Sequence, residues 1–315
     1  MDEERNDILT EDTGFEREVT DTPDVFAGKS PFIYRAGMNI FREESATNAS
    51  VEYIKKCARI GRINNYDIAV IQMVYKYKFL NRRMLLIMTG KKEASLKKTL
   101  KKLVGNGFLV RYYCTYPATT GETYSTPFFY GVSKGVFDFF SKTWDKGIFY
   151  MPEPLPAMKT LAMNQFIVSS REYRNDMAAE KFNIEIDVNR YIYRYPYSST
   201  FSVGGVPVTF VPIVVRREEK NVDIAIASLK MMFGMIKRFD LGAAPILICE
   251  DVMHMAALRD AIEKEERLKD IVIYYTYDLA IPGGRMFDRI YVYSGQTGEG
   301  TPAFSERCFE FDSIA

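Results

Sequence analysis

The stretch KYKFLNRRMLLIMTGKKEASLKKTLKKLVGNGFLVR, residues 76–111, decides the fold of the first half of the chain and dominates its charge pattern. It contains eleven basic residues and one acidic residue, Glu93, although the formal net charge of all 315 residues is only +1. Such a local excess of positive charge attracts phosphate groups. Apolar residues recur between the lysines at helical spacing, so the sequence predicts that the charge lies on a folded element and not on a tail.

Three helices are predicted in and before this stretch. The first begins at Asn64 or Asn65, the second follows Asn81 as its N-cap and ends at Thr89-Gly90, and the third runs from about Lys91 to Gly105. Aromatic and β-branched residues at 108–116 and 128–130 then predict two strands, separated by a polar loop at 117–127. This order of elements is that of a winged helix-turn-helix at about residues 60–140.

The third helix is amphipathic when its residues are projected at about 100° per residue. One face is predicted to carry Leu96, Leu100, Leu103 and Val104, and the other to carry Lys91, Lys92, Ser95, Lys98, Thr99 and Lys102. Lysines and hydroxyls suit DNA phosphates, and short side chains would let the helix enter a major groove. Further candidate contacts are Arg82 and Arg83 in the second helix and Thr119 and Thr120 in the loop between the strands. The alternative is that the lysines form a solvated face, but the scarcity of acids and the following strands favour DNA.

The rest of the chain divides by composition. Residues 1–48 are predicted to form a mobile arm, because the segment begins with an acidic run that has few large apolar residues. Prolines mark 141–156 as a linker, 157–300 is predicted to be an α/β domain with a mixed sheet, and 301–315 a tail. Within that domain we predict helices at 157–181, 221–240 and 251–268 and strands at 183–195, 206–216, 245–249, 271–277 and 287–293. The fold class is therefore α/β, or α+β overall.

Composition also limits the chemistry. The single histidine, His254, excludes histidine-pair acid–base schemes and most metal clusters, and we expect it to be structural. Four widely spaced cysteines without a CxxC pair predict free thiols in a cytoplasmic protein, with no metal site. No apolar run approaches the roughly 20 residues that span a bilayer. No cofactor is expected.

Three segments carry a resemblance to a known family. Residues 80–90 (LNRRMLLIMTG), 96–109 (LKKTLKKLVGNGFL) and 129–135 (FYGVSKG) resemble the replication–relaxation proteins of Gram-positive plasmids and conjugative elements. In that family a winged helix precedes a domain resembling PD-(D/E)XK nucleases. The resemblance implies binding to double-stranded DNA as a relaxosome accessory factor. Candidate partners are a relaxase, a replication initiator or a second copy of the chain.

Nuclease chemistry would require carboxylates that bind a divalent metal. The segments where this fold would place them, 197–201 and 210–216, contain no acid. A shifted site made from Asp187, Glu218 and Lys220 is the alternative. We therefore expect a non-enzymatic DNA-binding protein with a degenerate nuclease-like domain. A transcriptional regulator, a metal-dependent nuclease using the shifted site, and a module that binds an acidic protein remain alternatives.

Overall fold

The structure is a computed structural model of the full chain. It describes residues 30–43, 49–117, 123–141, 152–169, 186–188, 191–193, 199–203, 206–217, 222–239, 243–268, 271–279, 290–296 and 302–307. Helices and strands are mixed throughout, in two main sheets, which confirms the α+β class. Among these residues no helix is both long and apolar enough to cross a membrane.

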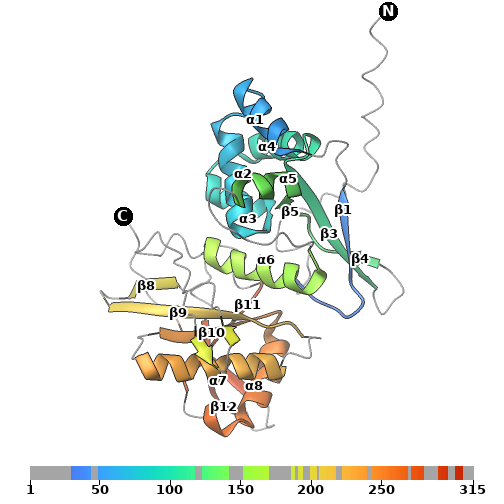
Figure 1. Ribbon diagram of the computed structural model, residues 1–315. Coiled ribbons are helices and arrows are strands. Elements are labelled where there is room, and N and C mark those ends of the chain that lie inside the picture. Colours follow the sequence, from blue (N-terminus) through green and yellow to red (C-terminus); the bar gives the residue numbers. More distant parts are fainter. Residues whose placement is uncertain are drawn as a thin grey trace, which may run out of the picture.

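The first half combines helices with an antiparallel sheet (Figure 1). Its helices are α1 (Val51–Arg59), α2 (Asn65–Tyr77), α3 (Arg82–Thr89), α4 (Glu93–Gly105) and α5 (Lys134–Ser141). Its strands are β1 (Asn39–Glu43), β2 (Leu80–Asn81), β3 (Leu109–Pro117), β4 (Thr123–Ser125) and β5 (Phe129–Val132), in the order β1-β3-β5-β2, with β4 also paired to β3. The three predicted helices (α2, α3 and α4) and the two predicted strands (β3 and β5) are all present.

Polar caps and a glycine set the limits of these helices, as the sequence predicts. Asn64 and Asp67 form a capping box at the start of α2, in which each side chain accepts a hydrogen bond from the other residue's backbone N–H. Asn81 accepts from the N–H of Met84 at the start of α3. Gly90, at a φ of 61°, ends α3 in the left-handed conformation that glycine adopts without strain.

The second half is built on a six-stranded mixed sheet. Its strands are β8 (Ser199–Val203), β9 (Val206–Val214), β10 (Ala243–Cys249), β11 (Tyr274–Tyr277), β12 (Ile290–Gln296) and β13 (Pro302–Arg307), in the order β13-β12-β11-β10-β9-β8. Strands β9, β10 and β11 run parallel, and the other pairs are antiparallel. Helices α7 (Val222–Phe239) and α8 (Val252–Glu263) flank β10 in the chain, and η3 (Glu266–Leu268) precedes β11. Strands β6 (Ile186–Val188) and β7 (Tyr191–Tyr193) form a separate hairpin.

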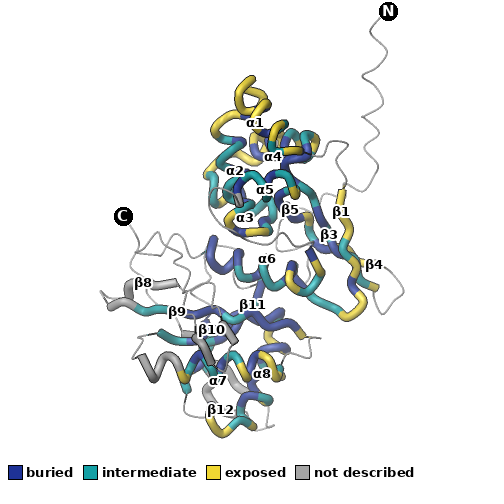
Figure 2. Tube along the Cα trace, viewed as in Figure 1, coloured by how far each residue is buried: buried dark blue, intermediate teal, exposed yellow. Residues whose placement is uncertain are grey.

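Helix α6 (Pro154–Ser169) lies between the two halves (Figure 1). Alternate residues of a strand face opposite sides of a sheet, and in β10 Ile246 and Ile248 join the core on the α6 side, whereas Leu247 and Cys249 pack with α7 and α8. The α6-side core continues into the first half, and α6 itself is buried around most of its circumference (Figure 2). The two halves therefore share one hydrophobic core.

The N-terminal boundary of the fold differs from the prediction. Residues 30–43 belong to the folded protein and not to a mobile arm: Phe32, Ile33 and Met38 are buried, and β1 pairs with β3. These three apolar residues follow the acidic run and supply the burial that the run lacks. The remainder of the predicted arm, 1–29 and 44–48, lies outside the described residues.

Three further boundaries differ. Pro154 and Pro156, in the predicted linker, lie in the first turn of α6, where a proline's missing N–H costs no helical hydrogen bond. The single strand predicted at 183–195 is instead the two short strands β6 and β7. Part of the predicted C-terminal tail forms β13, which pairs with β12 and is the last strand at that end of the sheet.

Candidate nucleic-acid interface

Helix α4 presents a basic outer face. Leu96, Leu100 and Leu103 are buried against the rest of the first half, as predicted. On the opposite side Lys97, Lys98 and Lys101 are exposed, together with Ser95, and within the described part of the chain none of these lysines forms an ion pair. The outer face of α4 is therefore a row of free ammonium groups.

Lys91 and Lys92 extend this row at the start of the helix. Both are exposed, and the ammonium group of Lys91 lies 5.7 Å from the centre of the Tyr66 ring, a cation–π contact with α2. Lys92 is the N-cap residue of α4 and makes no side-chain capping bond. Its side chain therefore takes no part in holding the helix end.

Two residues predicted for this face take part in the packing of α4: the predicted exposure of Thr99 is wrong, and Lys102 is engaged in an ion pair. Thr99 is buried, because it is three residues after Leu96 and four before Leu103, on the packed side. Lys102 forms an ion pair with the buried carboxylate of Asp67 in α2. Its charge holds α4 onto α2 and is not available to a ligand.

Two residues of the outer face were missed by the sequence analysis. Lys97 and Lys101 belong to the basic stretch, but the projection did not place them on the candidate surface. Their spacing could have indicated this position: Lys97 and Lys101 are four residues apart and so share one side of the helix, which lies opposite the packed residue Thr99. The exposed face is centred on Lys97, Lys98 and Lys101.

The other predicted contacts are less available. Arg82 in α3 forms an ion pair with Glu93 at 3.2 Å, which ties the starts of α3 and α4 together. Arg83 is half-buried. Thr119 and Thr120, which follow β3 and precede β4 in the chain, lie outside the described residues.

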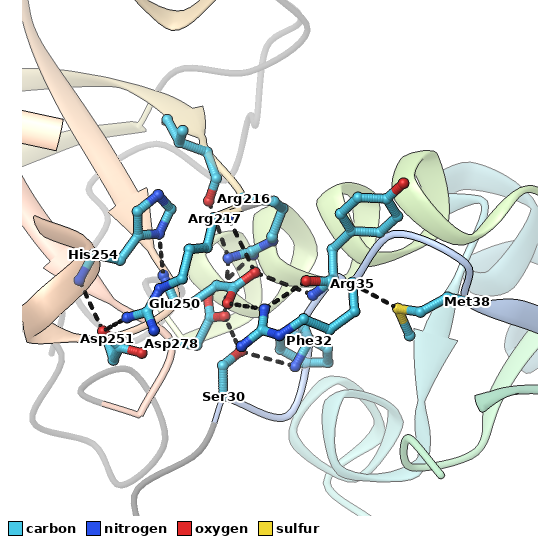
Figure 3. Close-up of polar contacts among 12 residues, drawn as sticks. Ser30, Phe32, Arg35, Met38, Arg216, Arg217, Glu250, Asp251, His254 and Asp278 are labelled. Carbon is cyan, nitrogen blue, oxygen red and sulfur yellow. Dashed lines mark hydrogen bonds and ion pairs between the residues drawn. The ribbon is translucent and has the colours of Figure 1, made fainter. Parts of the chain in front are cut away.

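A second polar cluster lies at the carboxyl ends of the three parallel strands (Figure 3). Arg216, after β9, and Asp278, after β11, form an ion pair at 3.0 Å in which both side chains are fully buried. The hydroxyl of Ser30 donates to Asp278, and the side-chain amide of Gln165 in α6 donates to the Asp278 carbonyl oxygen at 3.0 Å. The cluster thus joins the N-terminal segment and α6 to the sheet.

Glu250, after β10, holds the same N-terminal segment. Its carboxylate accepts from the N–H of Tyr34 at 3.0 Å and from the guanidinium group of Arg35 at 3.0 Å, and it also accepts from the N–H of Arg217 at 3.3 Å. Residues Ser30–Arg35, which we call the strap, therefore lie across the carboxyl end of the parallel strands (Figure 3).

Burial shifts two pKa values in this cluster. It lowers the pKa of His254 to about 4, an effect that the carboxylate of Glu250 opposes. It raises the pKa of Asp278 to about 6, which the Arg216 guanidinium group and the Ser30 hydroxyl oppose. The Nδ1 atom of His254 accepts from the N–H of Glu250 at 3.2 Å, in agreement with the structural role expected for this histidine.

Ligands often bind at the carboxyl ends of parallel strands, but here the strap occupies that position. Asp251 caps α8, accepting from the N–H of His254. Among the described residues no three His, Cys, Asp or Glu side chains are grouped so as to hold a metal ion. The alternative shifted site is not described: Glu218 and Lys220 lie outside the described residues, and Asp187 is in β6, whose side chains are not described.

No protein-family model, no curated protein and no solved structure matches this chain. The basic face of α4 and the polar cluster beneath the strap are the two features of the described residues that bear on function.

Proposed function

We propose that this chain is a non-enzymatic protein that binds double-stranded DNA through helix α4. The observation that carries the proposal is the exposed row Lys97, Lys98 and Lys101, which has no acidic partner among the described residues. Lysine side chains that contact DNA phosphates release counterions, and this release supplies most of the sequence-independent part of the affinity. A row of uncompensated lysines on a packed helix provides such contacts on a rigid support.

The arrangement of the first half supports this proposal. Helices α2, α3 and α4 are followed by the hairpin of β3 with β4 and β5, the element order of a winged helix. In such a domain α4 would be the helix that enters the major groove, and the paired strands β3 and β4 would belong to the wing. Ser95 and Ala94 are short and exposed on α4, so they would allow the helix to approach the base edges closely.

The second half is proposed to be a nuclease-like platform without catalytic activity. Its order of helix α6, hairpin β8–β9, helix α7 and parallel strand β10 is compatible with a PD-(D/E)XK-like core. The buried carboxylates of Glu250 and Asp278 are neutralised by Arg35 and Arg216 and covered by the strap. Carboxylates engaged in this way are poor ligands for a catalytic divalent ion.

The resemblance to replication–relaxation proteins suggests the biological setting. The chain would act as an accessory factor at an origin of replication or transfer, together with a relaxase or a replication initiator. A transcriptional regulator would use the same DNA contacts and would differ in where its DNA site lies.

The test is the salt dependence of duplex binding by the full chain. Fluorescence anisotropy should show binding to a 30-bp duplex, with log K falling linearly as log salt rises. K97A/K101A should reduce the slope by about two units, because each phosphate contact contributes about 0.9. The matched control is K264A/R267A, which removes two exposed positive charges from the end of α8 and from η3.

Two results would contradict the proposal. If the wild type does not bind the duplex, or if K97A/K101A and the control have the same slope as the wild type, α4 is not a DNA-binding surface. Cleavage of linear, supercoiled or single-stranded DNA by the wild type with magnesium or manganese would contradict the non-enzymatic part.

A further inference from the structure

Helix α1 is a second basic element, which the sequence analysis did not consider. Lys55, Lys56 and Arg59 lie on its exposed side, and Arg62 follows it in the next turn of the chain. Within the described residues none of these four forms an ion pair, and Glu52 is the only acid in α1. Lys55, Lys56, Arg59 and Arg62 are called the α1 cations below.

The structure fixes α1 beside the C-terminal end of α4. The Tyr53 ring of α1 stacks on Phe108 with the ring centres 5.8 Å apart, and its hydroxyl donates to the Asn106 side-chain oxygen at 3.2 Å. Asn106 is the C-cap residue of α4 and donates in turn to the carbonyl oxygen of Lys102 at 2.7 Å. The end of α4 and the first half of α1 are thus one hydrogen-bonded unit.

The same side of α1 and its N-terminal end are anchored by further contacts. Ile54 and Cys57 are buried, and the Ser50 side chain caps the helix by accepting from the N–H of Tyr53. Gly135, at the start of α5, lies so close that an added Cβ atom would be 1.6 Å from the Ala49 carbonyl oxygen. Because one face and the N-terminal end of α1 are held in this way, the α1 cations on the exposed face are presented on a fixed support.

The cations of α1 and α4 lie on helices that are in contact. Lys56 is about one helical turn from Tyr53, and Lys101 is little more than one turn from Asn106. The Tyr53–Asn106 hydrogen bond therefore joins the two helices that carry these lysines. Duplex DNA presents one phosphate charge per about 1.7 Å of its axis, so a duplex that passes both helices offers phosphates to each row. Figures 1 and 2 show α1 and α4 at the same end of the molecule, with α1 largely exposed.

We propose that α1 is a second phosphate-binding element that extends the duplex interface beyond α4, an inference that rests on the proposed function. The occupant is the sugar–phosphate backbone of the duplex that α4 contacts. Lysine and arginine contacts to phosphate carry no sequence information, so α1 raises the affinity for any duplex and lengthens the site without changing the sequence preference.

The experiment compares three variants of the full chain that each lose two positive charges: K56A/R59A in α1, K97A/K101A in α4, and the control K264A/R267A. Each is titrated into fluorescent duplexes of 10 to 30 bp over a salt series, and circular dichroism verifies the fold. We expect K56A/R59A to lower the salt slope by about two units. Its affinity should also stop increasing at a shorter duplex length than that of the wild type.

The outcomes separate this inference from the proposed function. If K97A/K101A lowers the slope while K56A/R59A keeps the slope and the length dependence of the wild type, α1 is not part of the interface and the proposed function stands. If neither variant changes the slope, or if the wild type does not bind, both proposals fail. An equal loss in K264A/R267A would show that net charge alone causes the effect, and would overturn both assignments.

Discussion

Replacing His254 by asparagine should change how the stability of the protein depends on pH. His254 is buried at the start of α8, and its Nδ1 atom accepts a hydrogen bond from the N–H of Glu250. An asparagine oxygen can occupy nearly the same position and accept the same bond, but it does not titrate. H254N therefore removes a titrating group while retaining its hydrogen bond.

The expected change in the free energy of unfolding follows from the pKa of His254. Burial lowers the pKa of His254 from 6.5 to about 4, so the unfolded chain takes up a proton at a higher pH than the folded protein does. The imidazole therefore stabilises the fold above pH 6.5, and this stabilisation is lost as the pH falls towards 4. The gap between these two pKa values corresponds to roughly 3 kcal/mol.

The pKa of Asp278 acts in the opposite direction over nearly the same range. It is raised from 3.8 to about 6, so the folded protein takes up this proton first, and acidification from pH 6 to 4 stabilises the fold through this group. The two contributions oppose each other in the wild type. Removal of His254 leaves the contribution of Asp278 uncompensated.

The assay is urea denaturation followed by circular dichroism at pH 7, 6, 5 and 4 for wild type and H254N. Subtracting one free energy of unfolding from the other cancels every titrating group that the proteins share. The difference should shift in favour of H254N by roughly 3 kcal/mol between pH 7 and pH 4. A difference that stays constant over this range would refute the assignment of His254 as a buried neutral imidazole.

Three further substitutions have definite expectations. Thr99→Val should leave unchanged the DNA sequences selected from a random duplex pool, because Thr99 is buried in the first half. A changed consensus sequence would show that Thr99 contacts the DNA. Gly135→Ala should lower the free energy of unfolding by roughly 2–3 kcal/mol because its Cβ would meet the Ala49 carbonyl oxygen. In urea denaturation Gly234→Ala, which has no atom within 4 Å of the added Cβ, serves as its control. Asn164→Leu should cost roughly 2–4 kcal/mol in the same assay, since the Asn164 amide donates to the carbonyl oxygens of Tyr77 and Phe79 at 2.7 Å each; a loss below about 1 kcal/mol would contradict this role.

Local signals were sufficient to predict much of the first half. Asn64, Asn81 and Gly90 set helix limits through bonds to backbone only a few residues away, so their effect can be read from sequence. Long-range contacts could not be read in this way. The pairing of β1 with β3 and the ion pair of Arg216 with Asp278 join residues that are far apart in the sequence. No local pattern of residues predicts either contact.

The outer face of α4 was predicted in part. Lys98 and Ser95 are exposed as expected, but the projection placed Thr99 on the wrong side although its spacing from Leu96 and Leu103 indicated burial. Lys102 could not have been excluded from sequence, because its partner Asp67 belongs to another helix.

The shared core also limits what DNA binding by a truncated chain can show about the second half. Removing residues from about 157 onward would delete most of α6, whose buried side chains cover the first half. A loss of DNA affinity in such a fragment would reflect exposed apolar surface, so substitutions in the full chain are the better test of each half.

The contacts of the strap join residues that are synthesised at very different times. The Ser30 hydroxyl donates to Asp278, which lies 248 residues further along the chain. Ribosomes add about 5 to 20 residues per second, so the strap waits on the order of tens of seconds for its partners to be synthesised. During that interval the strap lacks Glu250 and Asp278, the two carboxylates that hold it. The strap therefore reaches its final contacts only after the residues that follow β10 and β11 have been synthesised.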